Sequence, residues 1–393
     1  MEYRMNRRTG DRISVIGLGA SSIGAAGETD GIATLELAFE NGVNYYDLAA
    51  GEAACFPLYG KAFSSVRDKV LYQIHFGADY TSGKYGWTTA LDNVKKAVAW
   101  QLEQLNTDYI DYGFIHCLDE ASDWDAYLKN GVLDYIQALK AQGVVRHIGM
   151  SSHTPALAQT ALDTGLVDML MFSINPGYDY HHGDYAKGSS DEREALYLRC
   201  EKDGVGISVM KAFSGGQLLD EKSSPFGKAL TKSQCIQYAL DKPGVLTVLP
   251  GIRNKQDMED ILSFLKASEE EKDYSVLGSF TPADTEGKCV YCHHCQPCPV
   301  GLDIGLINKY YEQHSKKSVA SLCSCSSSLE PPCWLLSSVT SSLRAALSSA
   351  PAPPSLRWAT LKLTFRNSSA ALRRPPLRPR TQVSAPMPRC SIR

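Results

Sequence analysis

The chain of 393 residues lacks long apolar runs and any strong excess of charge. No stretch is apolar over the roughly 18 residues that a membrane-spanning helix needs, and the basic residues near Met1 are not followed by the apolar core of a secretory signal. The net charge is only −3 and charged residues make up 21% of the chain, which is typical of a globular protein and does not favour a nucleic-acid binder. We therefore expect a cytoplasmic globular protein that binds neither membranes nor nucleic acid.

Acidic residues become scarce after residue 317. Residues 318–393 contain ten arginines and lysines but one acid, Glu330, whereas residues 1–317 contain 30 basic and 42 acidic residues. The same segment is rich in serine, alanine, proline and leucine without a steady period, and such a composition rarely builds a core. We expect residues 318–393 to be a disordered tail or a stretch translated out of frame.

The preceding sequence alternates short β-branched or aromatic runs with amphipathic helical stretches, which predicts strand–helix units around a parallel sheet. The stretch 90–105 illustrates the helices, because its apolar residues fall at three- and four-residue steps. Eight strands are expected, at residues 13–17, 43–49, 69–75, 109–116, 145–152, 168–175, 206–212 and 245–251.

Eight strands with eight helices fit a closed α/β barrel of the TIM type, written (β/α)8. An open, doubly wound sheet is the rival arrangement, but its first turn carries a G-x-G-x-x-G pattern. Here Gly17, Gly19 and Ser22 break that pattern at its third position. We therefore predict the barrel.

In a parallel barrel the reactive groups lie at the carboxyl ends of the strands, so the polar residues that end the predicted strands are the candidates for chemistry. These residues are Asp47, His75, His116, Ser151, Ser152, Asn175, Lys211 and the Pro250–Gly251 turn.

Five segments, GVNYYDLA, TDYIDYGFIH, GVVRHIGMSSH, VDMLMFSIN and VLPGIRNKQDMED, resemble the aldo/keto reductase signatures in their order and spacing. The resemblance covers roughly residues 1–275. It implies a (β/α)8 barrel in which NADP(H) exchanges hydride with a small carbonyl or alcohol substrate. In that family a tyrosine donates the proton, a lysine lowers its pKa, an aspartate holds the lysine, and a histidine orients the carbonyl.

Two residues match the family pattern directly, because Asp47 corresponds to its aspartate and His116 to its histidine. The family tyrosine precedes a glycine soon after the aspartate, and the corresponding candidate is Tyr59 of Tyr59–Gly60, inside an insertion. The family lysine is replaced by His75, which could provide positive charge only when protonated. Lys211 is the alternative source of that charge, or an anchor for an anion.

The resemblance also indicates how the cofactor binds. Ser151 and Ser152 correspond to the residues that hold the nicotinamide carboxamide, while Met171 replaces a glutamine and Met210 replaces the aromatic residue that stacks on the ring. Asn175 and Lys211, which end two further predicted strands, are the remaining candidates for cofactor binding at the strand ends.

The last predicted helix follows Pro250 and Gly251, and its amino terminus could hold a phosphate. Arg253 or Lys255 would neutralise a 2′-phosphate there, so the sequence favours NADPH over NADH.

Four cysteines, Cys289, Cys292, Cys295 and Cys298, follow each other at C-x2-C spacing and end in Pro299. This spacing is typical of thiolates around a [4Fe–4S] cluster. Zinc, with His293 and His294 as further ligands, is the alternative, although structural zinc sites usually separate their cysteine pairs. The pattern resembles the iron–sulfur subgroup of the family, but Cys323, Cys325 and Cys333 lack the spacing of its second cysteine motif.

These observations predict three parts: a reductase-like barrel at residues 1–275, a ferredoxin-type cluster segment at 276–317, and the tail at 318–393. We expect an NADP-dependent oxidoreductase for a carbonyl or alcohol, with an electron-transfer partner if the cluster carries electrons. A catalytically silent nucleotide-binding barrel that acts as a redox sensor and a cluster-bearing electron-transfer protein are the alternatives.

Overall fold

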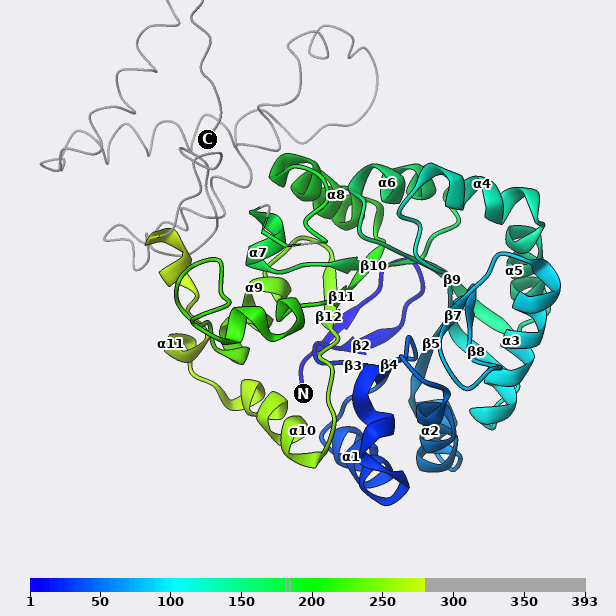
Figure 1. Cartoon of the computed structure of the whole chain (residues 1–393), viewed down its shortest axis with the longest axis horizontal. Coiled ribbons are helices and arrows are strands. Elements are labelled where there is room, and N and C mark those ends of the chain that lie inside the picture. The colour runs from blue at the N-terminus through cyan, green and yellow to red at the C-terminus, as the bar shows by residue number, and fades with distance from the viewer. Residues whose placement is uncertain (181, 184, 280–393) are drawn as a thin grey trace, which may run out of the picture. The chain divides into compact units, whose positions relative to one another are not determined.

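The computed structural model describes residues 1–180, 182–183 and 185–279. Its centre is an eight-stranded parallel sheet with the strand order β12-β11-β10-β9-β8-β5-β4-β3 (Figure 1). The strands are β3 (Leu18–Gly19), β4 (Tyr45–Asp47), β5 (Leu71–Phe76), β8 (Ile110–Ile115), β9 (Val145–Ser152), β10 (Met169–Ser173), β11 (Gly206–Met210) and β12 (Val245–Val248).

The two edges of this sheet meet, so the sheet forms a nearly closed barrel. Parallel bridges join Ile16 to Val248 and Gly19 to Gly251. The amide of Gly17 donates to the carbonyl of Val248 at 2.9 Å, on the same seam. A side chain at Gly17 would collide with Leu249 and Thr247, because its Cβ would lie 2.7 Å and 2.9 Å from them. The glycine is therefore required where the first and last strands approach each other.

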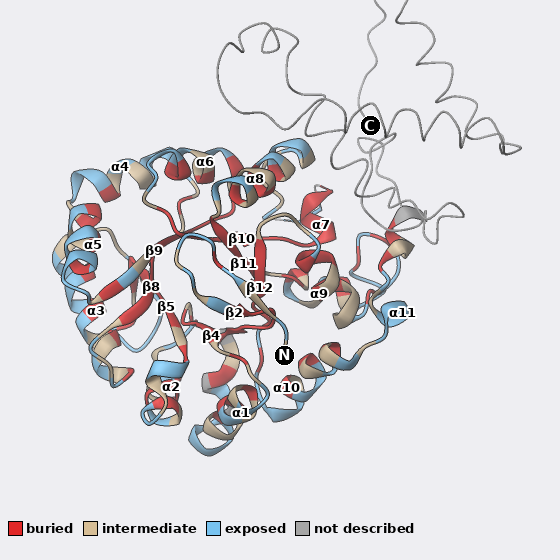
Figure 2. Ribbon diagram, turned by 180° about the vertical axis from the view of Figure 1, so that it is seen from behind, coloured by how far each residue is buried: buried red, intermediate tan, exposed pale blue. Residues whose placement is uncertain are grey.

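Helices surround the barrel, and each except α11 has buried residues on it (Figure 2). They are α1 (Glu28–Glu40), α2 (Phe56–Phe63), α3 (Leu91–Gln104), α4 (Ala121–Lys129), α5 (Val132–Ala141), α6 (Pro155–Asp163), α7 (Pro176–Asp179), α8 (Ser190–Asp203), α9 (Lys232–Leu240), α10 (Lys255–Leu262) and α11 (Glu269–Lys272). Short 3-10 turns occur at Ala20–Ala26, Ala53–Cys55, Arg67–Lys69, Ser214–Leu219, Ser263–Lys266 and Ser275–Ser279. Among the described helices, none combines the length and the apolar character needed to cross a membrane.

The predicted barrel is confirmed, and β9 begins and ends at the predicted residues 145 and 152. The first predicted strand, 13–17, is wrong. Residues Arg12–Ser14 form β2, which pairs antiparallel with β1 (Tyr3–Met5) in a separate hairpin, and the barrel strand β3 begins at Leu18. The apolar residue Ile13 suggested a barrel strand. It is indeed buried, but as part of the hairpin, where it packs beside Tyr45 and Tyr112.

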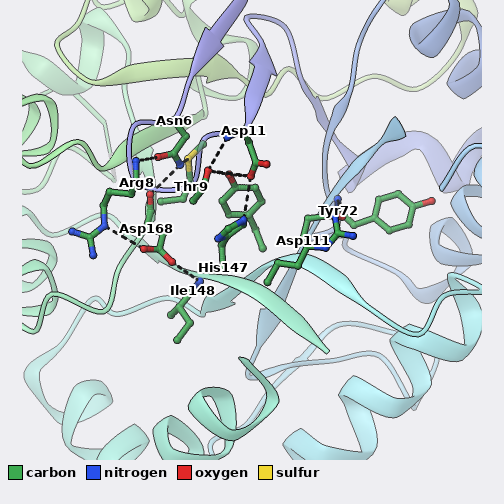
Figure 3. Close-up of polar contacts among 12 residues, drawn as sticks. Asn6, Arg8, Thr9, Asp11, Tyr72, Asp111, His147, Ile148 and Asp168 are labelled. Carbon is green, nitrogen blue, oxygen red and sulfur yellow. Dashed lines mark hydrogen bonds and ion pairs between the residues drawn. The ribbon is translucent and has the colours of Figure 1, made fainter. Parts of the chain in front are cut away.

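The β1–β2 hairpin closes the amino end of the barrel through polar contacts (Figure 3). The carboxylate of Asp11 accepts from the hydroxyl of Tyr112 at 2.6 Å and lies 3.4 Å from Nε2 of His147. Asn6 donates to the carbonyl of Asp168 at 3.1 Å, and Arg8 forms an ion pair with the Asp168 carboxylate at 3.2 Å. This end of the barrel is therefore occupied by structural contacts, and the opposite end remains for chemistry.

A buried ionic network ties α7, α8 and α9 together beside the barrel. The Asp179 carboxylate accepts from Nε of Arg193 at 2.8 Å and from the hydroxyls of Tyr197 and Tyr238, both at 2.7 Å. Burial would raise the pKa of Asp179, but the charges of Arg193 and Lys242 outweigh it and hold this pKa below its usual range. The network therefore contributes stability at neutral pH, and this contribution is lost as the pH falls through the aspartate range.

Removing the carboxylate should leave the Arg193 guanidinium buried without its partner. We expect Asp179→Ala to lower the free energy of unfolding by about 3–5 kcal/mol, measured by urea unfolding at neutral pH. Asp163→Ala is the control, because Asp163 pairs with Arg199 at 3.0 Å on the surface, where 68% of its side chain is exposed. That change should cost less than about 0.5 kcal/mol. Equal losses in the two variants would contradict the role of the buried network.

Candidate functional site at the carboxyl ends of the strands

Three predicted residues meet at the carboxyl-terminal mouth of the barrel. Asp47 ends β4, His75 lies near the end of β5, and His116 follows β8. Oδ1 of Asp47 lies 2.8 Å from Nε2 of His75, and Nδ1 of His75 lies 3.0 Å from Nδ1 of His116. All three side chains are buried, so these hydrogen bonds are shielded from water. Neighbouring parallel strands thus place a carboxylate and two imidazoles in one row.

A tyrosine outside the predicted set extends this row toward the surface. The hydroxyl of Tyr85 lies 2.8 Å from Nε2 of His116, and the Tyr85 ring meets the imidazole edge-on at a centroid distance of 5.8 Å. Tyr85 remains 43% exposed. We call Asp47, His75, His116 and Tyr85 the polar line, which runs from the buried carboxylate to a partly exposed tyrosine.

Tyr85 reaches this position on a hairpin that follows β5. The hairpin consists of β6 (Ala78–Asp79) and β7 (Gly86–Trp87), paired antiparallel. The chain turns away from β5 at Gly77, whose φ of 110° disfavours any other residue. A side chain there would also lie 2.4 Å from the hydroxyl of Tyr127, which donates to the carbonyl of Phe76 at 2.7 Å.

The hairpin is fixed to the loop that follows β4. The Tyr80 hydroxyl bonds both backbone groups of Ala50, at 2.9 Å and 3.0 Å. The amide of Tyr85 donates to the carbonyl of Gly51 at 3.2 Å, and Glu52 forms an antiparallel bridge with Lys84. The insertion after Asp47 therefore holds the hairpin that carries Tyr85.

Below the polar line, Gln73 fixes the orientation of Asp47. The Tyr45 hydroxyl donates to Oε1 of Gln73 at 2.6 Å, which leaves the amide nitrogen to donate to Oδ1 of Asp47 at 2.9 Å. The same nitrogen contacts the sulfur of Met171 at 3.4 Å. The buried carboxylate therefore receives hydrogen bonds from Gln73, His75 and the amide of Ala49, and among the described residues no lysine or arginine forms an ion pair with it.

The two outer members of the polar line are neutral at neutral pH. Burial, followed by the neighbouring charge of His75, lowers the pKa of His116 well below its usual range. Burial, followed by the nearby Cys117 thiol, raises the pKa of Tyr85 to about 12. A phenol with this pKa stays protonated, so it can donate a hydrogen bond without forming a phenolate.

The structure does not bring Tyr59 to the polar line. Tyr59 lies in α2, is fully buried, and packs its ring against Tyr46, Phe63 and Tyr72. Its hydroxyl is buried without a hydrogen-bond partner among the described residues. Tyr59 lies twelve residues after Asp47 in the chain, and among the described residues its hydroxyl makes no hydrogen bond to Asp47, His75 or His116.

The predicted cofactor residues of β9 and β10 make mostly structural contacts. Ser151 Oγ accepts from the amide of Cys117 at 2.9 Å, and Ser152 Oγ donates to the carbonyl of Leu118 at 2.5 Å. Asn175 accepts from the amide of Tyr178 at 2.9 Å and donates to the carbonyl of Lys211 at 2.9 Å. These side chains hold the loops after β8, β10 and β11 in place.

A second polar cluster lies at the same end of the barrel. Nδ1 of His153 lies 2.8 Å from Asp119, and its ring stacks on Tyr185 with a centroid distance of 4.5 Å. Nζ of Lys211 lies 3.9 Å from the centre of the Tyr185 ring. Nε2 of His153 is buried without a partner among the described residues. Burial would raise the pKa of Asp119, but the hydrogen bonds and charge of His153 hold it below its usual range.

Two residues at this end adopt the left-handed backbone conformation that favours glycine. Cys117, after β8, has a φ of 51°, and Lys211, after β11, has a φ of 59°. Such conformations cost about 1–3 kcal/mol each and are concentrated at functional sites. Both residues flank the polar line and the second cluster, which supports this end of the barrel as the site.

Arg253 lies at the start of α10, where the sequence places an anion site. Its guanidinium forms two hydrogen bonds with the Asp257 carboxylate, at 2.8 Å and 3.1 Å, and its side chain is 71% exposed. Pro250 and Gly251 form the turn before it, where the Pro250 carbonyl accepts from Gly19 at 3.2 Å. The side chain of Asn254 caps the first turn of α10 by accepting from the amide of Asp257.

The cysteines predicted to bind a cluster, Cys289, Cys292, Cys295 and Cys298, lie outside the described residues, as do the tail 318–393 and residues 280–317 of the preceding segment. The described part of the chain contains no group of three or more histidine, cysteine or acidic side chains arranged to hold a metal ion.

Sequence reasoning missed Tyr85, His153 and Asp119. The sequence does contain one signal for Tyr85. Tyr85–Gly86 is a tyrosine–glycine pair like Tyr59–Gly60, which was chosen as the candidate. The hairpin that delivers Tyr85 has strands of two residues each, too short for any periodicity. His153 follows the predicted serine pair directly, and its partner Asp119 follows His116 by three residues.

Comparisons with known proteins agree with this architecture. The model of the aldo/keto reductase family matches residues 15–234, which is more than half of the chain. L-galactose dehydrogenase of Arabidopsis thaliana is 27% identical over 299 residues, covering 66% of this chain and 86% of that protein. An uncharacterized oxidoreductase of Bacillus subtilis is 24% identical over 295 residues, covering 69% of this chain and 94% of that protein.

Among solved structures, the holo form of an aldo-keto reductase from Bacillus halodurans is similar, with a TM-score of 0.55 and 21% identity. The likeness covers 69% of this chain and 94% of that structure, and it concerns the fold alone. The eight-stranded barrel, the aspartate and histidine at its mouth and the family match lead to one conclusion. This chain belongs to the aldo/keto reductase family of oxidoreductases.

Proposed function

We propose that the chain uses NADP(H) to interconvert a small carbonyl compound and the corresponding alcohol. The observation that carries this proposal is the row of Asp47, His75 and His116 at the mouth of a barrel of this family. Hydride transfer to a carbonyl carbon leaves negative charge on the oxygen, which needs a hydrogen-bond donor and then a proton. The polar line provides groups for both tasks at one place.

The residues beside the polar line fit a nicotinamide nucleotide, which would supply or accept the hydride when bound. The buried Nε2 of His153 has no partner among the described residues, and a polar group of the cofactor would satisfy it. Ser151 lies on the same strand, and Lys211 provides a cation after β11. These residues, with Ser152 and Asn175 fixing the surrounding loops, are the proposed cofactor contacts.

The preference for NADPH over NADH depends on the start of α10. Arg253 and Lys255 are the basic residues there, and a 2′-phosphate would compete with Asp257 for the Arg253 guanidinium. Because this ion pair is exposed, the competition costs little.

Removing Arg253 should therefore weaken the binding of NADPH more than that of NADH. We expect Arg253→Ala to raise the Kd of NADPH about five-fold and to leave that of NADH nearly unchanged, measured by nucleotide fluorescence titration. Asp257→Asn is the matched opposite change, because it releases the guanidinium and should tighten NADPH. Equal effects on the two nucleotides would remove Arg253 from the 2′-phosphate site.

His75 takes the place of the family lysine, and its charge depends on protonation. We expect His75→Ala to lose carbonyl reduction at every pH, because the side chain that joins Asp47 to His116 is removed. His75→Lys should retain activity at higher pH, because lysine keeps its charge there. NADPH consumption with p-nitrobenzaldehyde and NADP reduction with L-galactose provide the assays, the sugar being chosen from the name of the Arabidopsis relative.

His116→Ala completes this experiment. It should also abolish turnover, because it removes the side chain that connects His75 with the mouth. If His75→Ala and His116→Ala both kept full turnover, the reductase mechanism would be wrong and a nucleotide-binding sensor would explain the chain better.

We also propose that residues 276–317, which follow the barrel of residues 1–275 in the sequence, hold a [4Fe–4S] cluster, with an electron-transfer partner if the cluster is redox-active. The support is the spacing of Cys289, Cys292, Cys295 and Cys298. An anaerobic preparation should contain iron and sulfide and should lose both in Cys292→Ser. Cys323→Ser is the control that should keep them. A preparation containing zinc in place of iron would contradict the proposal.

A further inference from the structure

The hydrogen bonds of the polar line determine which ring nitrogens carry hydrogen. A carboxylate only accepts, so Nε2 of His75, 2.8 Å from Asp47, must carry a hydrogen. The amide nitrogen of Gln73 lies 3.0 Å from the same ring nitrogen, and in this state its two hydrogens point to Asp47 and to the sulfur of Met171 instead. A neutral His75 then has only a lone pair on Nδ1, and His116 must donate to it from its own Nδ1 across 3.0 Å. Nε2 of His116 is consequently an acceptor, and the Tyr85 hydroxyl donates inward to it. In this state the Tyr85 oxygen presents lone pairs to the mouth.

One additional proton reverses the direction of these hydrogen bonds. If His75 is doubly protonated, its Nδ1 donates to Nδ1 of His116, which must then carry its own hydrogen on Nε2. His116 now donates to the Tyr85 oxygen, and the hydroxyl hydrogen of Tyr85 is free to point to the mouth. The same four residues therefore present either an acceptor or a donor to a ligand.

We propose that Tyr85 is the catalytic residue that exchanges the proton with the substrate oxygen, and that a proton held on His75 beside Asp47 determines whether Tyr85 donates or accepts. This inference rests on the proposed oxidoreductase activity. In reduction, the carbonyl carbon receives the hydride pair of electrons that the cofactor supplies, and the carbonyl oxygen takes the hydrogen of Tyr85. The hydrogen on Nε2 of His116 replaces it, and the hydrogen on Nδ1 of His75 moves to His116. Reduction thus consumes the stored proton, and oxidation of the alcohol restores it.

The surroundings of the polar line leave His75 as the holder of this proton. The neighbouring titratable groups are Tyr45, Cys55, Tyr59 and Tyr80 around Asp47, Asp119 and His153 near His116, and Cys117 near Tyr85, with Lys211 acting on Cys117. The phenols and thiols around Asp47 have pKa values raised by burial and stay neutral. His116 has a lowered pKa and does not keep a second proton. His75 is the member of the polar line that contacts the carboxylate directly, with its Nε2 2.8 Å from Oδ1 of Asp47.

Tyr85 suits this role better than Tyr59 because of where their hydroxyls lie. The Tyr85 hydroxyl bonds His116, and Tyr85 is 43% exposed at the outer end of the polar line. The Tyr59 hydroxyl is buried and has no hydrogen-bond partner among the described residues, and the Tyr59 ring packs against Tyr46 and Tyr72. The same substitution at both positions therefore separates a catalytic hydroxyl from a structural one.

The first experiment compares Tyr85→Phe with Tyr59→Phe in the full-length protein. We expect Tyr85→Phe to lower kcat for p-nitrobenzaldehyde with NADPH by about 100-fold or more, with the Kd of NADPH nearly unchanged, because a general acid is lost. Tyr59→Phe removes an unpartnered hydroxyl and should keep kcat within about two-fold of wild type. Full activity of Tyr85→Phe would overturn the assignment, as would loss of activity confined to Tyr59→Phe.

The second experiment observes the stored proton without turnover. In protein labelled with 15N-histidine, His116 should carry its hydrogen on Nδ1 at high pH and on Nε2 at low pH, changing together with the double protonation of His75. Tyr85→Phe should shift the Nε2 resonance of His116, and Tyr59→Phe should leave it unchanged. A wild type that consumes no NADPH would overturn the proposed function and the role of Tyr85 with it. A wild type that turns over while His116 keeps one tautomer would overturn the stored proton alone.

Discussion

The site depends on a buried carboxylate that has to be compensated without a lysine. Asp47 is almost completely enclosed at the end of β4, and an ionised carboxylate in such a place is stable only if hydrogen bonds and opposite charge replace its water. Here Gln73 and His75 provide the hydrogen bonds, and His75 is the group that can add charge. The orientation of Gln73, the tautomer of His75 and the direction of the hydrogen bond to His116 all follow from this requirement.

A histidine in this position changes the chemistry as well as the charge. A lysine holds a fixed positive charge near neutral pH, whereas an imidazole beside a carboxylate can gain or lose a proton in the physiological range. Its second ring nitrogen also continues the hydrogen-bond chain, which an ammonium group cannot do as both donor and acceptor. His75 therefore gives the site a connected hydrogen-bonded path from Asp47 to Tyr85.

The barrel could be predicted from the sequence because its signals are local and repeated. Eight apolar runs separated by amphipathic helices identify the fold, and the polar residues that end them identify Asp47, His75 and His116 as neighbours. The first strand was misplaced because an apolar residue such as Ile13 is buried both in a barrel strand and in a hairpin packed against the barrel. Its apolar character therefore does not distinguish the two positions. The role of Tyr85 could not be predicted from the sequence pattern. Its position depends on contacts between two loops, and such contacts produce no periodic pattern of apolar residues in the sequence.

The two loops that frame the mouth explain why the family arrangement is rebuilt with different residues. The loop after Asp47 leads into α2, where Tyr59 is buried, and it offers the backbone of Ala50, Gly51 and Glu52 to the hairpin after β5. This loop thus holds the hairpin that brings Tyr85 to His116. Because β4, β5 and β8 are adjacent in the sheet, the rigid part of the site stays in place while the loops exchange the residue that meets the substrate.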